Sequence, residues 1–117
     1  MTRISFEGFN NQYATFIAEE GMTSGTPVLF DEGNACYEAQ DGDAFTGICT
    51  ETRNGLATVL LQGYYEIKYS GTAPGYGYQR LIANGAAGVK LAGDEDEVPF
   101  VRVLKVDGDK KTVGFIL

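Results

Sequence analysis

Carboxylates, tyrosines and two cysteines are the side chains that could do chemistry in this chain of 117 residues, which contains no histidine. Histidine is the commonest general base and the commonest transition-metal ligand, so its absence excludes Ser-His and Cys-His nucleophilic pairs. Cys36 and Cys49 lie in strand-like sequence. We expect two buried, unreactive thiols there, with a disulfide between them as the alternative. We therefore expect no catalytic residue and no enzyme.

The acidic run from Asp94 to Glu97 could attract Ca²⁺, which prefers several oxygen ligands. Consecutive carboxylates on an extended segment point to opposite sides, however, and the spaced oxygens of a calcium loop are missing from the sequence. A solvated loop without a metal is the expectation. The pair Gly75 and Gly77 begins a dinucleotide-binding pattern, but Arg80 stands where its third glycine would fall, so we expect a turn and no cofactor.

Five tyrosines gather around the glycine-rich loop at residues 70–77, namely Tyr64, Tyr65, Tyr69, Tyr76 and Tyr78. Aromatic side chains in a wet loop can stack on sugars or anchor a protein interface. In the alternative, the first two straddle a sheet and the others pack the base of the loop. The candidate interface residues from this cluster are Tyr65, Tyr69, Tyr76 and Tyr78.

The first residues form a second candidate contact. Residues 1–11 carry Ile4, Phe6 and Phe9 among polar residues, which is typical of an extended arm or edge strand that packs on another subunit. The segment has no apolar core of a signal peptide, and no run in the chain is long enough to cross a membrane. Cytoplasmic synthesis is the expectation. The net charge of −7 argues against nucleic acid as a partner.

Residues 45–69 are expected to form the central hairpin of the fold. Asn54-Gly55 lies between two strand-like runs, and this dipeptide is a strong hairpin signal. A two-residue turn there sets the register. It places Ile48, Ala57, Val59 and Leu61 on a core face, and it exposes the tip of the other face while burying its base. The expected cross-strand pairs are Arg53 with Leu56, Glu51 with Thr58, Cys49 with Leu60, and Phe45 with Tyr64.

Glycine-punctuated turns recur along the whole chain, and no apolar period of 3.6 residues persists. Strict alternation from Phe100 to Val106 indicates one strand with two distinct faces. The sequence predicts an all-β fold, a small barrel or sandwich of about eight to ten short antiparallel strands. It is organised as an extended N-terminal arm (residues 1–11) and a single β domain (residues 12–117).

The order of several motifs resembles that of the capsid decoration, or head-stabilising, proteins of tailed phages and prophages. The resemblance covers roughly residues 21–117. It departs at Val98-Pro99-Phe100, where the family pattern opens the penultimate strand with a Val-Gly step. The matching segments are Gly25-Thr26-Pro27-Val28, Gly42-Asp43-Ala44-Phe45-Thr46-Gly47-Ile48, Gly55, Val59-Leu60-Leu61-Gln62-Gly63, Ser70-Gly71 and Val113-Gly114-Phe115-Ile116-Leu117.

This resemblance implies a non-enzymatic structural protein of the virion. It would be made in the bacterial host cytoplasm and bind the major capsid protein on the capsid surface, often as a trimer. The arm residues Ile4, Phe6 and Phe9 would then dock on a neighbouring subunit or on the capsid. The alternative function is a carbohydrate- or ligand-binding β module that uses the tyrosine- and glycine-rich loop.

Overall fold

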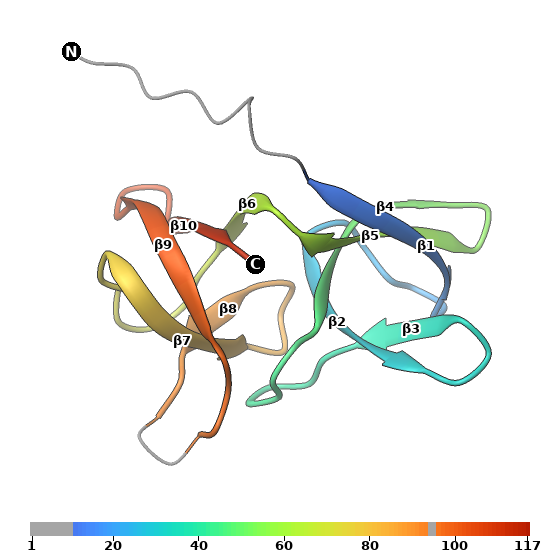
Figure 1. Cartoon of the computed structure of the whole chain (residues 1–117), viewed down its shortest axis with the longest axis horizontal. Coiled ribbons are helices and arrows are strands. Elements are labelled where there is room, and N and C mark those ends of the chain that lie inside the picture. Colours follow the sequence, from blue (N-terminus) through green and yellow to red (C-terminus); the bar gives the residue numbers. More distant parts are fainter. Residues whose placement is uncertain (1–10, 94–95) are drawn as a thin grey trace.

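Ten β-strands and no helix make up the computed structural model, which describes residues 11–93 and 96–117 (Figure 1). The all-β prediction is confirmed. No helix in this part of the chain could span a membrane. The strands are β1 (Gln12–Ala18), β2 (Thr26–Asp31), β3 (Ala35–Glu38), β4 (Gly47–Arg53), β5 (Leu56–Gln62), β6 (Tyr64–Lys68), β7 (Gly77–Ala83), β8 (Val89–Leu91), β9 (Phe100–Asp107) and β10 (Thr112–Ile116).

The first five strands close into a barrel in the order β1-β3-β2-β4-β5. β1 completes it by pairing antiparallel with β5 and parallel with β3, a parallel contact that the sequence did not predict. The barrel interior is apolar: Val28, Cys49, Ala57 and Val59 have no exposed surface. Closure removes the open strand edges through which sheets aggregate.

The other five strands form a second sheet in the order β6-β10-β9-β7-β8. An isolated parallel bridge between Tyr69 and Val89 brings its two ends together, and the backbone N–H of Ser70 donates to the carbonyl of Val89 at 3.0 Å. The sheet therefore curls around its own core, which includes Val113 and Phe115. Figure 1 shows the barrel and this second sheet side by side.

The hairpin of β4 and β5 begins as the sequence predicts. Asn54 and Gly55 have φ of 53° and 77°, as a type I′ turn requires, and Arg53 pairs with Leu56. The expected pair of Glu51 with Thr58 is also present. A β-bulge at residue 50 then shifts the register by one residue. The prediction that Cys49 faces Leu60 is therefore wrong, because Cys49 pairs with Val59 and Ile48 with Leu60.

The hairpin is also shorter than predicted. β5 ends at Gln62, and Gly63, with φ of 135°, turns the chain into β6 of the second sheet. Phe45 and Tyr64 are therefore not a cross-strand pair of one hairpin. Leu61, expected in the core, is 37% exposed.

The base of the hairpin is buried on both faces, as predicted, but the expected core face of Ile48, Ala57 and Val59 is wrong, because the bulge turns Ile48 to the other side. Cys49 and Val59 point into the barrel, whereas Ile48 and Leu60 belong to the core of the second sheet. The tip around Arg53 is exposed. The hairpin thus belongs to both cores.

Backbone hydrogen bonds join the two sheets at two further places. The N–H of Leu117 donates to the carbonyl of Gly63 at 2.8 Å, next to the crossing point. The N–H of Ala83 donates to the carbonyl of Asp43 at 2.9 Å, and Lys90 Nζ lies 2.7 Å from the carboxylate of Asp41. The loop between β3 and β4 is therefore linked to β7 by a hydrogen bond and to β8 by an ion pair.

Substitution at Gly47 tests how tightly the shared hairpin is packed. A Cβ at this position would lie 2.6 Å from Val59 Cγ1 and 3.1 Å from the carbonyl oxygen of Leu60. We expect Gly47→Ala to lower the free energy of unfolding by about 1–3 kcal/mol, the usual cost of overpacking, measured by urea denaturation. Gly108→Ala is the matched control, since a Cβ there meets nothing within 4 Å. Equal stabilities of the two variants would contradict the tight packing.

Candidate functional site

The outward face of β7 and β9 carries two cross-strand pairs of an arginine with an aromatic residue, Tyr78 with Arg102 and Arg80 with Phe100. Arg102 Nη2 donates a hydrogen bond to the Tyr78 hydroxyl at 2.5 Å, and its Cζ lies 5.0 Å from the centre of that ring. Arg80 Cζ lies 4.5 Å from the centre of the Phe100 ring. We call these four residues the aromatic–arginine face. Both guanidinium groups are held in place by stacking on a ring.

The alternation of β9 produces this face. Val101 and Val103 point inward and are buried, so Phe100 and Arg102 must point outward. Among the described residues, the lysines of the ion pairs Lys90–Asp41 and Lys105–Glu66 are bound to carboxylates, but neither arginine of the face is. Within this same part of the chain the buried Nε of Arg80 also has no hydrogen-bond partner. The face therefore presents cationic groups without anionic partners.

A shallow pocket of about 350 Å³ lies beside the face. Its walls come from β7, from the end of β8 and the loop that follows, and from the start of β9. It is lined by Tyr78, Gln79, Arg80, Leu91, Ala92, Gly93 and Phe100. Exposed rings next to charged hydrogen-bond donors are suited to binding a ligand or a protein surface.

The structure separates the tyrosines that the sequence grouped. Tyr76 and Tyr78 are 66% and 64% exposed, the latter on the aromatic–arginine face. Tyr69 is 5% exposed and lies in the core of the second sheet, so its side chain cannot reach a partner in this conformation. Tyr65 is half-buried against the same core, and burial raises its pKa. Burial, with a contribution from Glu66, raises the pKa of Tyr64 to about 12.

Sequence reasoning missed Arg80, Phe100 and Arg102 as members of a site. The alternation of β9 already separates Phe100 and Arg102 from the buried valines, and that signal could have nominated them. Their pairing with β7 could not be read from the sequence, because residues 84–99 separate the two strands.

An exposed apolar surface lies on the barrel, on the outward side of β1 and β5. Tyr13, Ile17 and Leu56 are 51%, 53% and 46% exposed. Thr15 lies between the first two, and Ile17 pairs with Leu56 across the strands. We call Tyr13, Thr15, Ile17 and Leu56 the β1 face.

Asn11, the first described residue, links the start of β1 to the start of β6. Its side-chain oxygen accepts a hydrogen bond from the backbone N–H of Tyr64 at 3.0 Å, and its Nδ2 donates to the Tyr13 hydroxyl at 3.1 Å. The predicted contact residues Ile4, Phe6 and Phe9 lie outside the described residues. In the sequence they come directly before the β1 face.

The charges are divided unequally between the two sheets. Residues 64–117 contain seven acidic and seven basic residues, whereas the barrel sequence, residues 12–62, contains eight acids and one base, Arg53. The barrel therefore accounts for the whole net charge of −7. Its acidic residues are Glu19, Glu20, Asp31, Glu32, Glu38, Asp41, Asp43 and Glu51.

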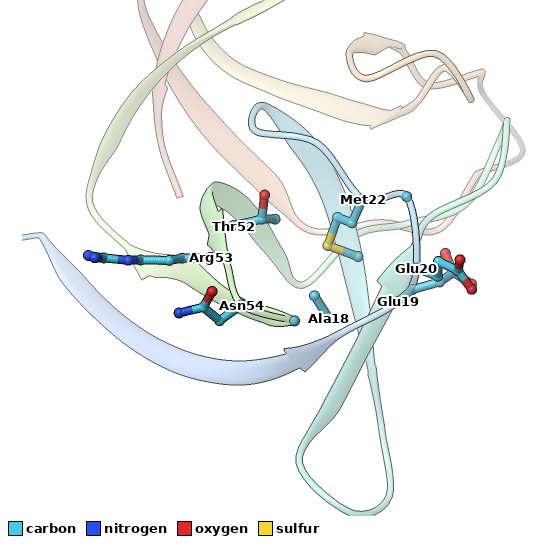
Figure 2. A pocket seen from close by; sticks show the side chains of 9 residues that line it. Ala18, Glu19, Glu20, Met22, Thr52, Arg53 and Asn54 are labelled. Atoms are coloured by element: carbon cyan, nitrogen blue, oxygen red, sulfur yellow. The ribbon is translucent and has the colours of Figure 1, made fainter.

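One end of the barrel gathers two of these carboxylates beside a hollow of about 310 Å³ (Figure 2). Figure 2 shows Glu19 and Glu20 pointing to the same side of this end, with Arg53 pointing to the opposite side. Glu19 Oε1 accepts a hydrogen bond from the backbone N–H of Glu38 at 3.3 Å. We call Glu19 and Glu20 the acidic barrel end.

The thiols are buried and free, as predicted, and the alternative of a disulfide is not observed. Burial raises the pKa of both; nearby Cys49 and Glu19 add to the shift at Cys36. In residues 11–93 and 96–117 there is no cluster of three or more potential metal ligands. Of the acidic run, Asp96 accepts a hydrogen bond from the N–H of Gly93 at 2.7 Å, whereas Asp94 and Glu95 lie outside the described residues.

No protein-family model, curated protein or solved structure matches the chain. The resemblance to phage decoration proteins therefore rests on the order of the sequence motifs.

The state of the thiols gives a direct test of the barrel interior. In the folded protein without reductant, Ellman's reagent should label neither cysteine rapidly, because both side chains are inaccessible and the raised pKa disfavours the reactive thiolate. In urea, still without reductant, both cysteines should react. Failure to label in urea would indicate a disulfide and would contradict the free thiols.

Proposed function

We propose that the chain is a structural virion protein that binds the outside of a phage or prophage capsid, like the decoration proteins that its motif order resembles. The observation that carries this proposal is the presence of two exposed surfaces, the apolar β1 face on the barrel and the aromatic–arginine face on the second sheet, where two exposed rings lie beside two arginines. Large exposed apolar patches on small proteins usually mark interaction sites. A protein that joins a lattice as an oligomer needs one contact with the lattice and another with its own copies.

The β1 face is the better candidate for the capsid contact. Its side chains are aliphatic, aromatic or hydroxylic, and none is charged, which is the composition of an interface centre. The segment with Ile4, Phe6 and Phe9 precedes it without interruption in the sequence. Arm and face would together form one extended apolar contact.

The partners and location follow from this role. The major capsid protein is the proposed partner, and the proposed assembly is a homo-oligomer, with a trimer favoured. Nucleic acid is not expected to bind, because the barrel carries a charge of −7. The proposed location is the capsid surface after synthesis in the host cytoplasm, and we expect no catalytic activity.

Deletion of residues 2–10 tests the arm. It should abolish binding to shells assembled from the major capsid protein of the phage or prophage that carries the gene, measured by co-sedimentation. The fold should be unchanged by circular dichroism, because Asn11 and all ten strands remain. Unchanged capsid binding by the shortened chain would contradict the proposed role of the arm.

Substitution on the β1 face tests the second half of the contact. Tyr13→Asp should weaken capsid binding at least about tenfold, since it removes an aromatic anchor and places a charge in an apolar interface. Tyr37→Asp is the control, because Tyr37 is an exposed barrel tyrosine outside this face. Equal binding by the two variants would exclude the β1 face as the capsid contact.

A carbohydrate-binding module is the second candidate. Tyr76, Tyr78 and Phe100 are all more than half exposed, and the last two line the 350 Å³ pocket. Exposed rings of this kind can stack on sugars. Binding of the chain to a glycan array separates the two functions. Binding of the wild type that is lost in Tyr78→Ala would favour the carbohydrate-binding module, and no binding to any glycan would favour the virion protein.

A further inference from the structure

We infer that copies of this chain bind one another head to tail, with the aromatic–arginine face of one copy against the acidic barrel end of the next. The inference rests on the homo-oligomer in the proposed function and names the surfaces that form it. It does not require a capsid.

The aromatic–arginine face calls for a partner with carboxylates. Arg80 and Arg102 stack on Phe100 and Tyr78, so their guanidinium groups are oriented before any partner arrives. Neither is in an ion pair with a carboxylate in the described part of the chain. A planar guanidinium binds a carboxylate with two parallel hydrogen bonds, which are among the stronger polar contacts in proteins.

A second copy of the chain supplies those carboxylates. The barrel holds the entire net charge, and Glu19 and Glu20 point together to one side of its end (Figure 2). The two arginines lie on neighbouring strands, two positions apart in the register, so they form a diagonal pair roughly 7–8 Å apart at the backbone. Two guanidinium groups therefore face two carboxylates.

The contact cannot form within one copy. Glu19 and Glu20 follow the end of β1 on the barrel, whereas β7 and β9 lie across the molecule from it (Figure 1). A contact between two different surfaces is heterologous. It repeats from copy to copy and must close into a ring or continue as a fibre. With the trimer of the proposed function, the expected product is a ring of three copies.

The test measures the mass of the full chain in solution by light scattering and its dissociation by sedimentation. The wild-type chain should show about three times its 12.6 kDa mass, and added salt should weaken the assembly, because exposed charge pairs are screened. Arg80→Glu combined with Arg102→Glu should raise the dissociation constant about a hundredfold or more. Glu19→Arg combined with Glu20→Arg should do the same.

Reversal of both surfaces in one chain provides the rescue. The chain with all four substitutions has opposite charges on both surfaces and should assemble again, which misfolding of either double variant could not explain. Lys68→Glu combined with Lys110→Glu is the matched control: it makes the same change in net charge away from the face and should assemble as the wild type does.

A wild-type monomer, or assembly that survives both double reversals, would overturn the inference. Capsid binding by a monomer would overturn the inference and the proposed homo-oligomer, but it would leave the proposed binding to the capsid intact. A ring that does not bind capsids would support the inference and contradict the proposed function.

Discussion

The burial of both faces of the β4–β5 hairpin is the constraint on which the rest of the structure depends. Val59 and Leu60 are neighbours in sequence with no exposed surface, yet one packs inside the barrel and the other in the core of the second sheet. Burying a side chain of this size contributes about 1.5–3 kcal/mol. Since the same strand contributes to both cores, neither sheet can lose its packing without exposing apolar surface of the other.

The crossing at Gly63 follows from this arrangement. β5 passes directly into β6 of the second sheet through Gly63, whose φ of 135° is one that only glycine adopts readily. The hydrogen bonds of Asn11 and Leu117 converge on the same point. Asn11, the first described residue, therefore lies where the barrel and the second sheet join.

Sequence reasoning succeeded where the determinants are local and failed where they are distant. Asn54-Gly55 fixes its own turn, and the first pairs of the hairpin follow from it. The bulge at residue 50 turns Cys49 into the barrel and Ile48 into the core of the second sheet, the reverse of the faces that the turn alone predicts. That second core is formed by residues much later in the chain. The burial of Tyr69, next to its bridge with Val89, likewise depends on contacts between residues distant in sequence. The alternation of β9 predicts that Phe100 and Arg102 share an outward face. The other two residues of the aromatic–arginine face join them only through the pairing of β9 with β7.

The division of charge limits how two copies can meet. Two barrels approaching each other bring together two surfaces that share the whole acidic excess, and two aromatic–arginine faces bring together four arginines; both contacts are repulsive. A symmetric dimer through either surface is therefore disfavoured by the same charges that favour the mixed contact. Because the barrel is closed, pairing through open strand edges is not available to it either. The attractive combination that this charge pattern provides is the unlike one, and a chain of unlike contacts sets a direction around a ring.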